Sequence, residues 1–341
     1  MNAPTRYLLA AMLALGAVGG ASLGHSGTAA AEEMTLKCAY PFWPGFAPVY
    51  LAQELGYFKE EGLEVSEVFD DDRGNVLPAL ERGDIGCDMR TVGEHQGRPR
   101  TPETQGRIIG TIDISLGGDG VLVEGSIKTF ADLKGKVFAA EPNTPARLIA
   151  QMGLKKYGLT FADLTLKDIA SADAIGVFAD PQVAGVAVYE PTLTQALKSS
   201  NKPGAYIIAS SRDYPGLITD VIVARTDDLK ENPEKYRRFL RGIYRAIDYF
   251  DKNHDDAVKI MAPHFKLSPE EYEEVLKNLA YTPYEQAVEF MGQNGQRGKL
   301  HDIFDQVMQL NLENGAADVK LDSDQQIDNS VITDLFKGHT R

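Results

Sequence analysis

The stretch that decides the fold is residues 41–65, PFWPGFAPVYLAQELGYFKEEGLEV. It predicts a loop rich in proline, glycine and aromatic residues, then a short helix, then a turn into a strand. The loop carries Trp43, the only tryptophan, and Phe46 just before the helix. Backbone N–H groups at the start of a helix have no partner within it and attract ligand oxygens. The stretch therefore predicts one wall of a small-molecule pocket, although a merely packed loop has the same composition.

The first 31 residues have the pattern of a secretory signal peptide. Arg6 supplies the positive charge, residues 7–18 are mostly apolar, and an Ala-x-Ala pattern ends at Ala31. Cys38 follows Thr-Leu-Lys, which is not a lipobox. We therefore expect cleavage near Ala31 and a soluble periplasmic protein without a lipid anchor.

Composition excludes several classes of function. A net charge of −14 argues against nucleic-acid binding and against binding to anionic membrane surfaces. Cys38 and Cys87 are too few for a disulfide framework. Both lie in predicted strands, so a single bridge and two buried thiols remain open alternatives.

Strands and helices alternate from residue 34 onward, which predicts an α/β fold. The β-α-β-α-β order of the first unit implies a parallel sheet covered on both faces. Its expected elements are strands 34–40, 63–69 and 85–89, helices 46–55 and 76–82, an exposed polar loop over 93–107, and a further strand over 108–114.

A second α/β unit follows the break at Gly117-Gly118-Asp119-Gly120. Asn143-Thr144-Pro145 opens one of its helices, because an N-cap residue and proline at the first position favour a helix start. The expected elements are strands 121–123, 136–140, 183–188 and 206–209, and helices 145–157, 173–178 and 192–198. A strand over 221–225 leaves the unit, and the remainder is predicted to be largely helical.

Motifs of catalysis are absent from the sequence. No histidine has a histidine or cysteine partner at metal-ligand spacing, and there is no Gly-x-Ser-x-Gly, P-loop or dinucleotide-binding motif. We therefore expect a binding protein with no catalytic residue, metal or cofactor.

Several blocks, in this order, resemble one family. They are WPGFAPVYLA (43–52), GYFKEEGLEV (56–65), ERGDIG (81–86), FADLKGK (130–136) and YEPTLTQA (189–196). The chain resembles the substrate-binding proteins of ABC importers in the nitrate/sulfonate/taurine group, also called SsuA/THI5-like or NMT1-like.

The resemblance implies a type II periplasmic-binding fold, with two α/β lobes that close on a ligand. Residues 32–119 and 220–341 would form lobe 1, and residues 120–219 would form lobe 2. It also implies a small-molecule ligand, an ABC permease with its ATPase subunits in the inner membrane as partners, and a protein that acts as a monomer.

In such folds ligands lie beyond the carboxyl ends of the strands, at helix N-termini. The candidate ligand-binding residues at these places are Tyr40, Trp43, Phe46, Arg90, Asp119, Glu141, Asn143, Thr144, Tyr189, Glu190 and Asp220.

Two ligand chemistries compete for this set. Sulfonate-type members hold an anion at helix starts, here residues 46–47 and 144–146, with Arg90 or Arg147 adding charge-assisted bonds. The expected carboxylates and aromatic rings instead suit an amine or amidine, and an aminosulfonate would satisfy both sets.

Each candidate also has a purely structural interpretation. Asp119 and Asp220 could be turn residues at the hinge, Glu190 could serve the Tyr-Glu-Pro turn, and Arg90 could pair with an acidic neighbour. The functional alternatives are a periplasmic lyase or dehydratase that uses Glu190 with Asp119 as an acid/base pair, and a ligand-loaded sensor partner.

Overall fold

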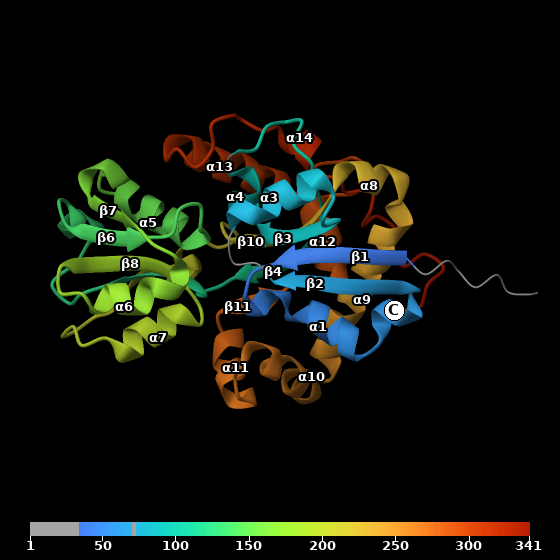
Figure 1. Cartoon of the computed structure of the whole chain (residues 1–341), viewed down its shortest axis with the longest axis horizontal. Helices are drawn as coiled ribbons and strands as arrows, with labels where there is room; N and C mark the ends of the chain where they lie inside the picture. Colours follow the sequence, from blue (N-terminus) through green and yellow to red (C-terminus); the bar gives the residue numbers. More distant parts are fainter. Residues whose placement is uncertain (1–33, 70–72, 98) are drawn as a thin grey trace, which may run out of the picture. The chain divides into compact units, whose positions relative to one another are not determined.

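The computed structural model describes residues 34–69, 73–97 and 99–341. The predicted signal peptide lies outside the described residues. The described residues form one compact unit, which contains two β-sheets (Figure 1). No helix among the described residues is both long and apolar enough to cross a membrane.

The first sheet has six strands in the order β11-β4-β10-β3-β1-β2. Strands β1, β2 and β3 are parallel, as the sequence predicted, whereas β10 runs antiparallel to both β3 and β4. The sheet as a whole is therefore mixed. Its strands are β1 Met34–Tyr40, β2 Leu63–Phe69, β3 Cys87–Thr91, β4 Arg107–Ser115, β10 Thr219–Ala224 and β11 Leu279–Tyr281.

The second sheet has five strands in the order β7-β6-β8-β5-β9. The sequence predicted four of them and missed β7, a short edge strand whose residues TLKD are mostly exposed and carry no apolar run. The strands are β5 Asp119–Val123, β6 Val137–Ala140, β7 Thr165–Asp168, β8 Val183–Tyr189 and β9 Tyr206–Ser210.

Helices cover both faces of the second sheet. Helix α5 (Pro145–Lys155) contacts β5 and β8, and helices α6 (Ala174–Ala179) and α7 (Thr192–Ser199) pack against β8 as well (Figure 1). Val186 and Val188 of β8 are buried with α6 and α7, whereas Ala187 between them belongs to the other core. This alternation is the period-2 pattern of a strand that is buried on both faces.

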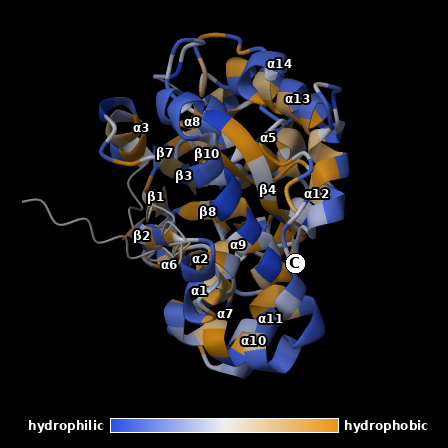
Figure 2. Ribbon diagram, turned by 90° about the vertical axis from the view of Figure 1, so that its right-hand side faces the viewer, coloured by the Kyte–Doolittle hydropathy of each residue, from blue (hydrophilic) through white to orange (hydrophobic). Residues whose placement is uncertain are grey.

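The remaining helices pack around the first sheet, and several come from the C-terminal part of the chain. These helices are α1 Ala47–Glu54, α2 Tyr57–Glu60, α3 Arg73–Arg82, α4 Val92–Gln96, α8 Thr226–Glu231, α9 Pro233–Lys252, α10 His254–Met261, α11 Pro269–Leu276, α12 Tyr284–Met291, α13 Lys299–Glu313 and α14 Ser323–Gln326. Figure 2 shows hydrophobic residues on β8 and β10, whereas outer helices such as α10 and α11 carry both hydrophobic and hydrophilic residues.

The expectation of an exposed loop over residues 93–107 is wrong for the first part of the stretch and holds for residues 99–105, which form a loop that is exposed or half-buried except at Arg100. Residues 92–96 form the buried helix α4, which packs against α13. Thr91 and Glu94 form a capping box at its start, a Thr-x-x-Glu signal that the surrounding glycine and arginine residues obscured. Asn311 of α13 donates to the Gly93 carbonyl at 2.9 Å, which fixes the helix in place.

Cys38 and Cys87 are joined by a disulfide. They are register partners on the parallel strands β1 and β3, and their Cα atoms are 4.3 Å apart. The bridge resolves the alternative that the sequence left open, and it fits an oxidising compartment.

The chain passes between the two sheets twice among the described residues. It leaves the first sheet after Ser115 and returns at Thr219. The two crossings touch each other, because the Ser211 hydroxyl bonds the Ser115 hydroxyl at 2.8 Å and accepts from the Gly117 N–H at 2.6 Å. Crossings side by side are what a hinge between lobes requires, and the division into lobes at residues 119 and 219 stays a prediction.

Candidate ligand-binding site

A small pocket is lined by residues of both sheets. The first sheet and its helices supply most of the wall, the second sheet supplies Asp119 and Tyr189, and helix α5 supplies Pro145. At its centre the cavity measures about 20 Å³, so there is room for a group roughly the size of one water molecule. The lining residues are Pro41, Trp43, Phe46, Thr91, Glu94, Asp119, Pro145, Tyr189 and Asp220.

Trp43 is held in the pocket wall by a buried carboxylate. Its indole N–H lies 3.2 and 3.3 Å from the two oxygens of Asp113, a fully buried residue of β4. Gly45 makes this approach possible, because a Cβ at that position would overlap both the Asp113 carboxylate and the Trp43 nitrogen. The Tyr281 hydroxyl donates to the Pro44 carbonyl at 2.9 Å and fixes the loop from the other side.

The opposite edge of the Trp43 ring meets the second sheet and the crossing. Its ring lies 6.3 Å from that of Tyr189 in an edge-on arrangement, with an interplanar angle of 84°. The far end of the indole contacts Gly118, which lies in the first crossing. Trp43 is therefore in contact with both halves of the molecule and with the connection between them.

Gly118→Ala is expected to lower the free energy of unfolding by about 1–3 kcal/mol, the usual cost of overpacking. The added Cβ would overlap the Trp43 ring, which cannot retreat without breaking its bond to Asp113. Chemical denaturation followed by tryptophan emission measures the change. Gly176→Ala in α6 is the matched control, since no atom lies within 4 Å of its added Cβ. Equal stabilities of the two variants would contradict the tight contact.

Carboxylates gather behind and beside this aromatic wall. Asp113 and Asp220 are register partners on the antiparallel strands β4 and β10, and both are buried. The pKa of Asp113 is raised to about 8, chiefly by burial; the Trp43 N–H opposes this rise, and the charge of the neighbouring Asp119 adds to it. Burial, followed by the charge of Asp113, raises the pKa of Asp220 well above its usual value.

Glu94 supplies a third lining carboxylate, beside Asp119 and Asp220. One of its oxygens accepts from the Thr91 N–H at 2.9 Å and from the Thr91 hydroxyl at 2.8 Å. The start of α4 is therefore already occupied by the carboxylate of Glu94. The described lining residues include no lysine or arginine, so the pocket favours a cationic group over an anion.

The structure brings five of the eleven predicted residues to this pocket. They are Trp43, Phe46, Asp119, Tyr189 and Asp220.

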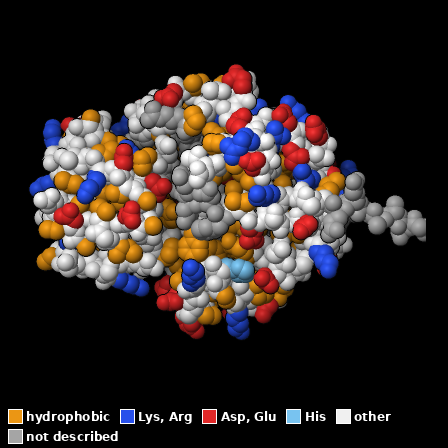
Figure 3. Space-filling view, in the orientation of Figure 1, with side chains coloured by type: hydrophobic (Ala, Val, Ile, Leu, Met, Phe, Trp, Pro, Cys, Tyr) orange, Lys and Arg blue, Asp and Glu red, His pale blue; other side chains and the backbone are white. Residues whose placement is uncertain are grey.

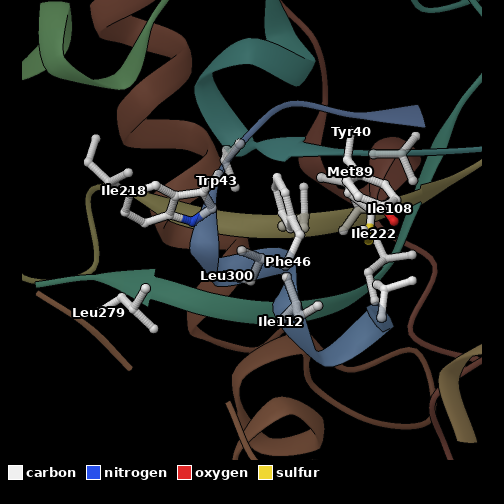
Figure 4. Close-up of a cluster of buried hydrophobic side chains, with 14 of the residues drawn as sticks. Tyr40, Trp43, Phe46, Met89, Ile108, Ile112, Ile218, Ile222, Leu279 and Leu300 are labelled. Atoms are coloured by element: carbon white, nitrogen blue, oxygen red, sulfur yellow. The ribbon is translucent and has the colours of Figure 1, made fainter. Parts of the chain in front are cut away.

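Tyr40, predicted from its place at the end of a strand, is instead part of the core. Its ring packs 5.8 Å from those of Phe46 and Tyr50, and Figure 4 shows it beside Met89, Ile108 and Ile222, away from Trp43. A strand alternates its side chains between two faces, and strand position alone did not reveal which face Tyr40 takes.

Arg90, Glu141 and Glu190 have other partners. Arg90 forms an ion pair with Asp88 at 2.5 Å, which is the structural alternative that the sequence offered. Glu141 accepts from the backbone and the side chain of Ser171, and Glu190 accepts from Thr194 in the same way. Glu190 is not among the pocket-lining residues, so no Glu190–Asp119 acid/base pair faces the pocket.

The start of α5 contributes Pro145 to the pocket and not the residues predicted there. The Thr144 hydroxyl donates to the Glu141 carbonyl at 3.0 Å, and Asn143 lines a neighbouring cavity with Arg90. Arg147 forms an ion pair with Asp168.

The sequence analysis missed Thr91, Glu94 and Asp113. The capping pattern was the signal for Thr91 and Glu94, and an acidic residue within an apolar strand was the signal for Asp113.

Comparisons with known proteins fit this geometry. The family model described as "NMT1/THI5 like" matches residues 43–257. The chain belongs to the NMT1/THI5-like family. Its fold is that of type II periplasmic binding proteins: the alkanesulfonate-binding protein SsuA of Xanthomonas axonopodis pv. citri superposes with a TM-score of 0.71 at 17% identity, covering 88% of this chain and all of that one.

Relatives in this family differ in what they do. A Brucella abortus protein described as a binding protein is 24% identical over 254 residues, which are 73% of this chain and 77% of the relative. The 4-amino-5-hydroxymethyl-2-methylpyrimidine phosphate synthase of Aspergillus parasiticus is 27% identical over 243 residues, which are 64% of this chain and 66% of the relative. Family membership is therefore compatible with binding and with synthesis. The ligand class has to be inferred from the residues that line the pocket.

Proposed function

We propose that the protein is the periplasmic solute-binding component of an ABC importer, and that its ligand carries a cationic nitrogen. An amine or amidine satisfies the pocket directly, and an aminosulfonate would do so through its amino group. The observation that carries the proposal is the composition of the pocket: Asp119, Asp220 and Glu94 beside the rings of Trp43 and Tyr189, with no described lysine or arginine in its lining.

Further findings support this proposal. The fold matches a sulfonate-binding protein, and the Brucella relative is described as a binding protein. The Cys38–Cys87 bridge and the predicted signal peptide suit a periplasmic protein. The aminopyrimidine in the name of the Aspergillus relative is also a nitrogen-rich small molecule, which fits the proposed ligand class.

The mechanism follows from the position of the pocket. Its walls come from both sheets, so a ligand there contacts both halves and stabilises the closed arrangement over the open one. The permease and its ATPase subunits would recognise the closed form. The cavity is nearly filled in this structure, so ligand entry requires the two halves to separate at the crossings between them.

The single tryptophan makes the test direct. Mature protein is titrated with amines, amidines and aminosulfonates, and with nitrate and alkanesulfonates lacking nitrogen, while Trp43 emission and heat are recorded. We expect saturable binding of the nitrogenous compounds and none of the simple anions. Binding of the anions alone would overturn the ligand class, and binding of no compound in either set would count against solute binding itself. Ligand-dependent association with a membrane-embedded permease would test the transport partner.

A further inference from the structure

A second, larger groove adjoins the pocket at Tyr189. Tyr189 lines both spaces, and Phe42, which precedes Trp43 in the chain, lines the groove. The groove measures about 540 Å³, whereas the pocket measures about 20 Å³. The pocket thus holds a single small group in this structure, and the room for the rest of a ligand lies beyond Tyr189.

The walls of the groove are largely apolar. Phe42 packs on Phe265 with ring centroids 5.2 Å apart, and Phe265 stacks on Tyr272 at 5.6 Å. The second-sheet side contributes Ile175 and Pro191. Figure 3 shows hydrophobic side chains gathered in the hollow between the second-sheet region and the region of α10 and α11.

The charges of the groove differ from those of the pocket. Its carboxylate, Glu141, already accepts from the Ser171 N–H at 3.0 Å and from the Ser171 hydroxyl at 2.5 Å. Its cation is Lys266, an exposed residue. A ligand cation is therefore attracted to the pocket and not to the groove, and apolar surface is accommodated best in the groove.

We propose that the groove binds the apolar body of the same ligand whose cationic nitrogen lies in the pocket. The ligand class is thus narrowed from small amines to primary amines with an alkyl or aryl body, oriented with the nitrogen toward Asp119 and Asp220 and the body past Tyr189. This inference rests on the proposed function of the pocket. It assigns the groove to the same ligand because Tyr189 lines both the groove and the pocket.

A series of linear alkylamines tests the inference by calorimetry. From propylamine to hexylamine, affinity is expected to rise about fourfold for each added methylene, the value for transfer of one methylene out of water. We expect 1,6-diaminohexane to bind more weakly than hexylamine, because its second ammonium would lose water against apolar walls and meet Lys266, while Glu141 already accepts two hydrogen bonds from Ser171. Equal affinities along the series, or tighter binding of the diamine, would overturn the inference.

A pair of matched variants locates the effect. Ala172 is exposed and lines the groove, so Ala172→Trp fills the groove at little risk to the fold. Ala179, also exposed, lies at the end of α6 in the same half of the molecule and outside the groove, and Ala179→Trp is the control. Ala172→Trp is expected to weaken hexylamine binding at least tenfold and to leave propylamine unchanged, while Ala179→Trp changes neither.

The outcomes separate this inference from the proposed function. If propylamine binds and hexylamine gains nothing over it, or if Ala172→Trp has no effect, the apolar subsite is wrong and the cation pocket stands. If no amine of any length binds, the cation pocket fails and the groove inference fails with it.

Discussion

Asp119→Asn is expected to weaken the binding of hexylamine by about a hundredfold, within the range measured when one partner of a buried charge pair is removed. Asp119 is 2% exposed, begins β5, and is the register partner of Tyr189 across to β8. An ammonium in the pocket would therefore lie against its carboxylate and against the tyrosine ring. Asparagine keeps the size and the oxygen of the side chain and removes the charge, so the loss reports on charge.

Calorimetry of the folded variant measures this effect, with tryptophan emission as a second probe. Asp173→Asn is the control, because Asp173 is exposed in the same half of the molecule and its replacement changes the net charge by the same amount. We expect the control to bind as the parent protein does. Unchanged affinity in Asp119→Asn, or an equal loss in both variants, would show that the cation does not lie beside Asp119.

The sequence predicted four residues of the pocket because they lie at the ends of strands and at the crossings between the sheets. Trp43 and Phe46 follow the first strand, and Asp119 and Asp220 lie where the chain changes sheets, so the order of the elements, together with the fold that the resemblance implied, located all four. Asp113 could not be located in this way. It lies inside an apolar strand, and only the register of β4 against β10 shows that its carboxylate faces Asp220.

Other residues were misplaced for reasons that are equally local. Glu94 stands in a stretch dense in glycine and arginine, and its role became visible only when Thr91 and the packing of α13 showed that the stretch is helical. Arg90 was expected to contact a ligand, but it forms an ion pair with Asp88, which lies two residues earlier on the same face of the strand. Strand ends point to the region of a site, and side-chain partners decide which residues face it.

The buried pair Asp113 and Asp220 predicts that ligand binding is coupled to the release of a proton. The two carboxylates are cross-strand partners, and the groups that face them are Asp119, Glu94, Trp43, Tyr272 and Tyr281, none of which is a cation. With the pKa of Asp113 raised to about 8 and that of Asp220 raised as well, the pair retains a proton at pH 7. An ammonium bound beside the pair favours the charged carboxylates, so binding should release a proton.

Affinity for hexylamine should therefore rise by about tenfold per pH unit between pH 6 and pH 8 if one proton is released, while an alkylamine stays protonated below about pH 10. Calorimetry at pH 7 in phosphate and in Tris, whose ionisation enthalpies differ, counts the proton directly. Asp113→Asn keeps an oxygen that can accept from the Trp43 N–H and removes one of the two titrating groups, so its pH slope should be shallower. A pH-independent affinity with no buffer dependence would contradict the coupling.

The Asp113–Asp220 pair also predicts how the stability of the unliganded protein depends on pH. Because the pKa of Asp113 is raised in the folded state, the folded protein holds a proton that the unfolded chain has lost between about pH 4 and pH 8. The contribution of this group to stability is therefore complete below that window and lost as the pH rises through it. In thermal unfolding without ligand, the Tm of the parent protein should fall more between pH 5 and pH 8 than the Tm of the Asp113→Asn variant. Saturating hexylamine should reduce the fall, because the bound ammonium stabilises the carboxylates in their charged form.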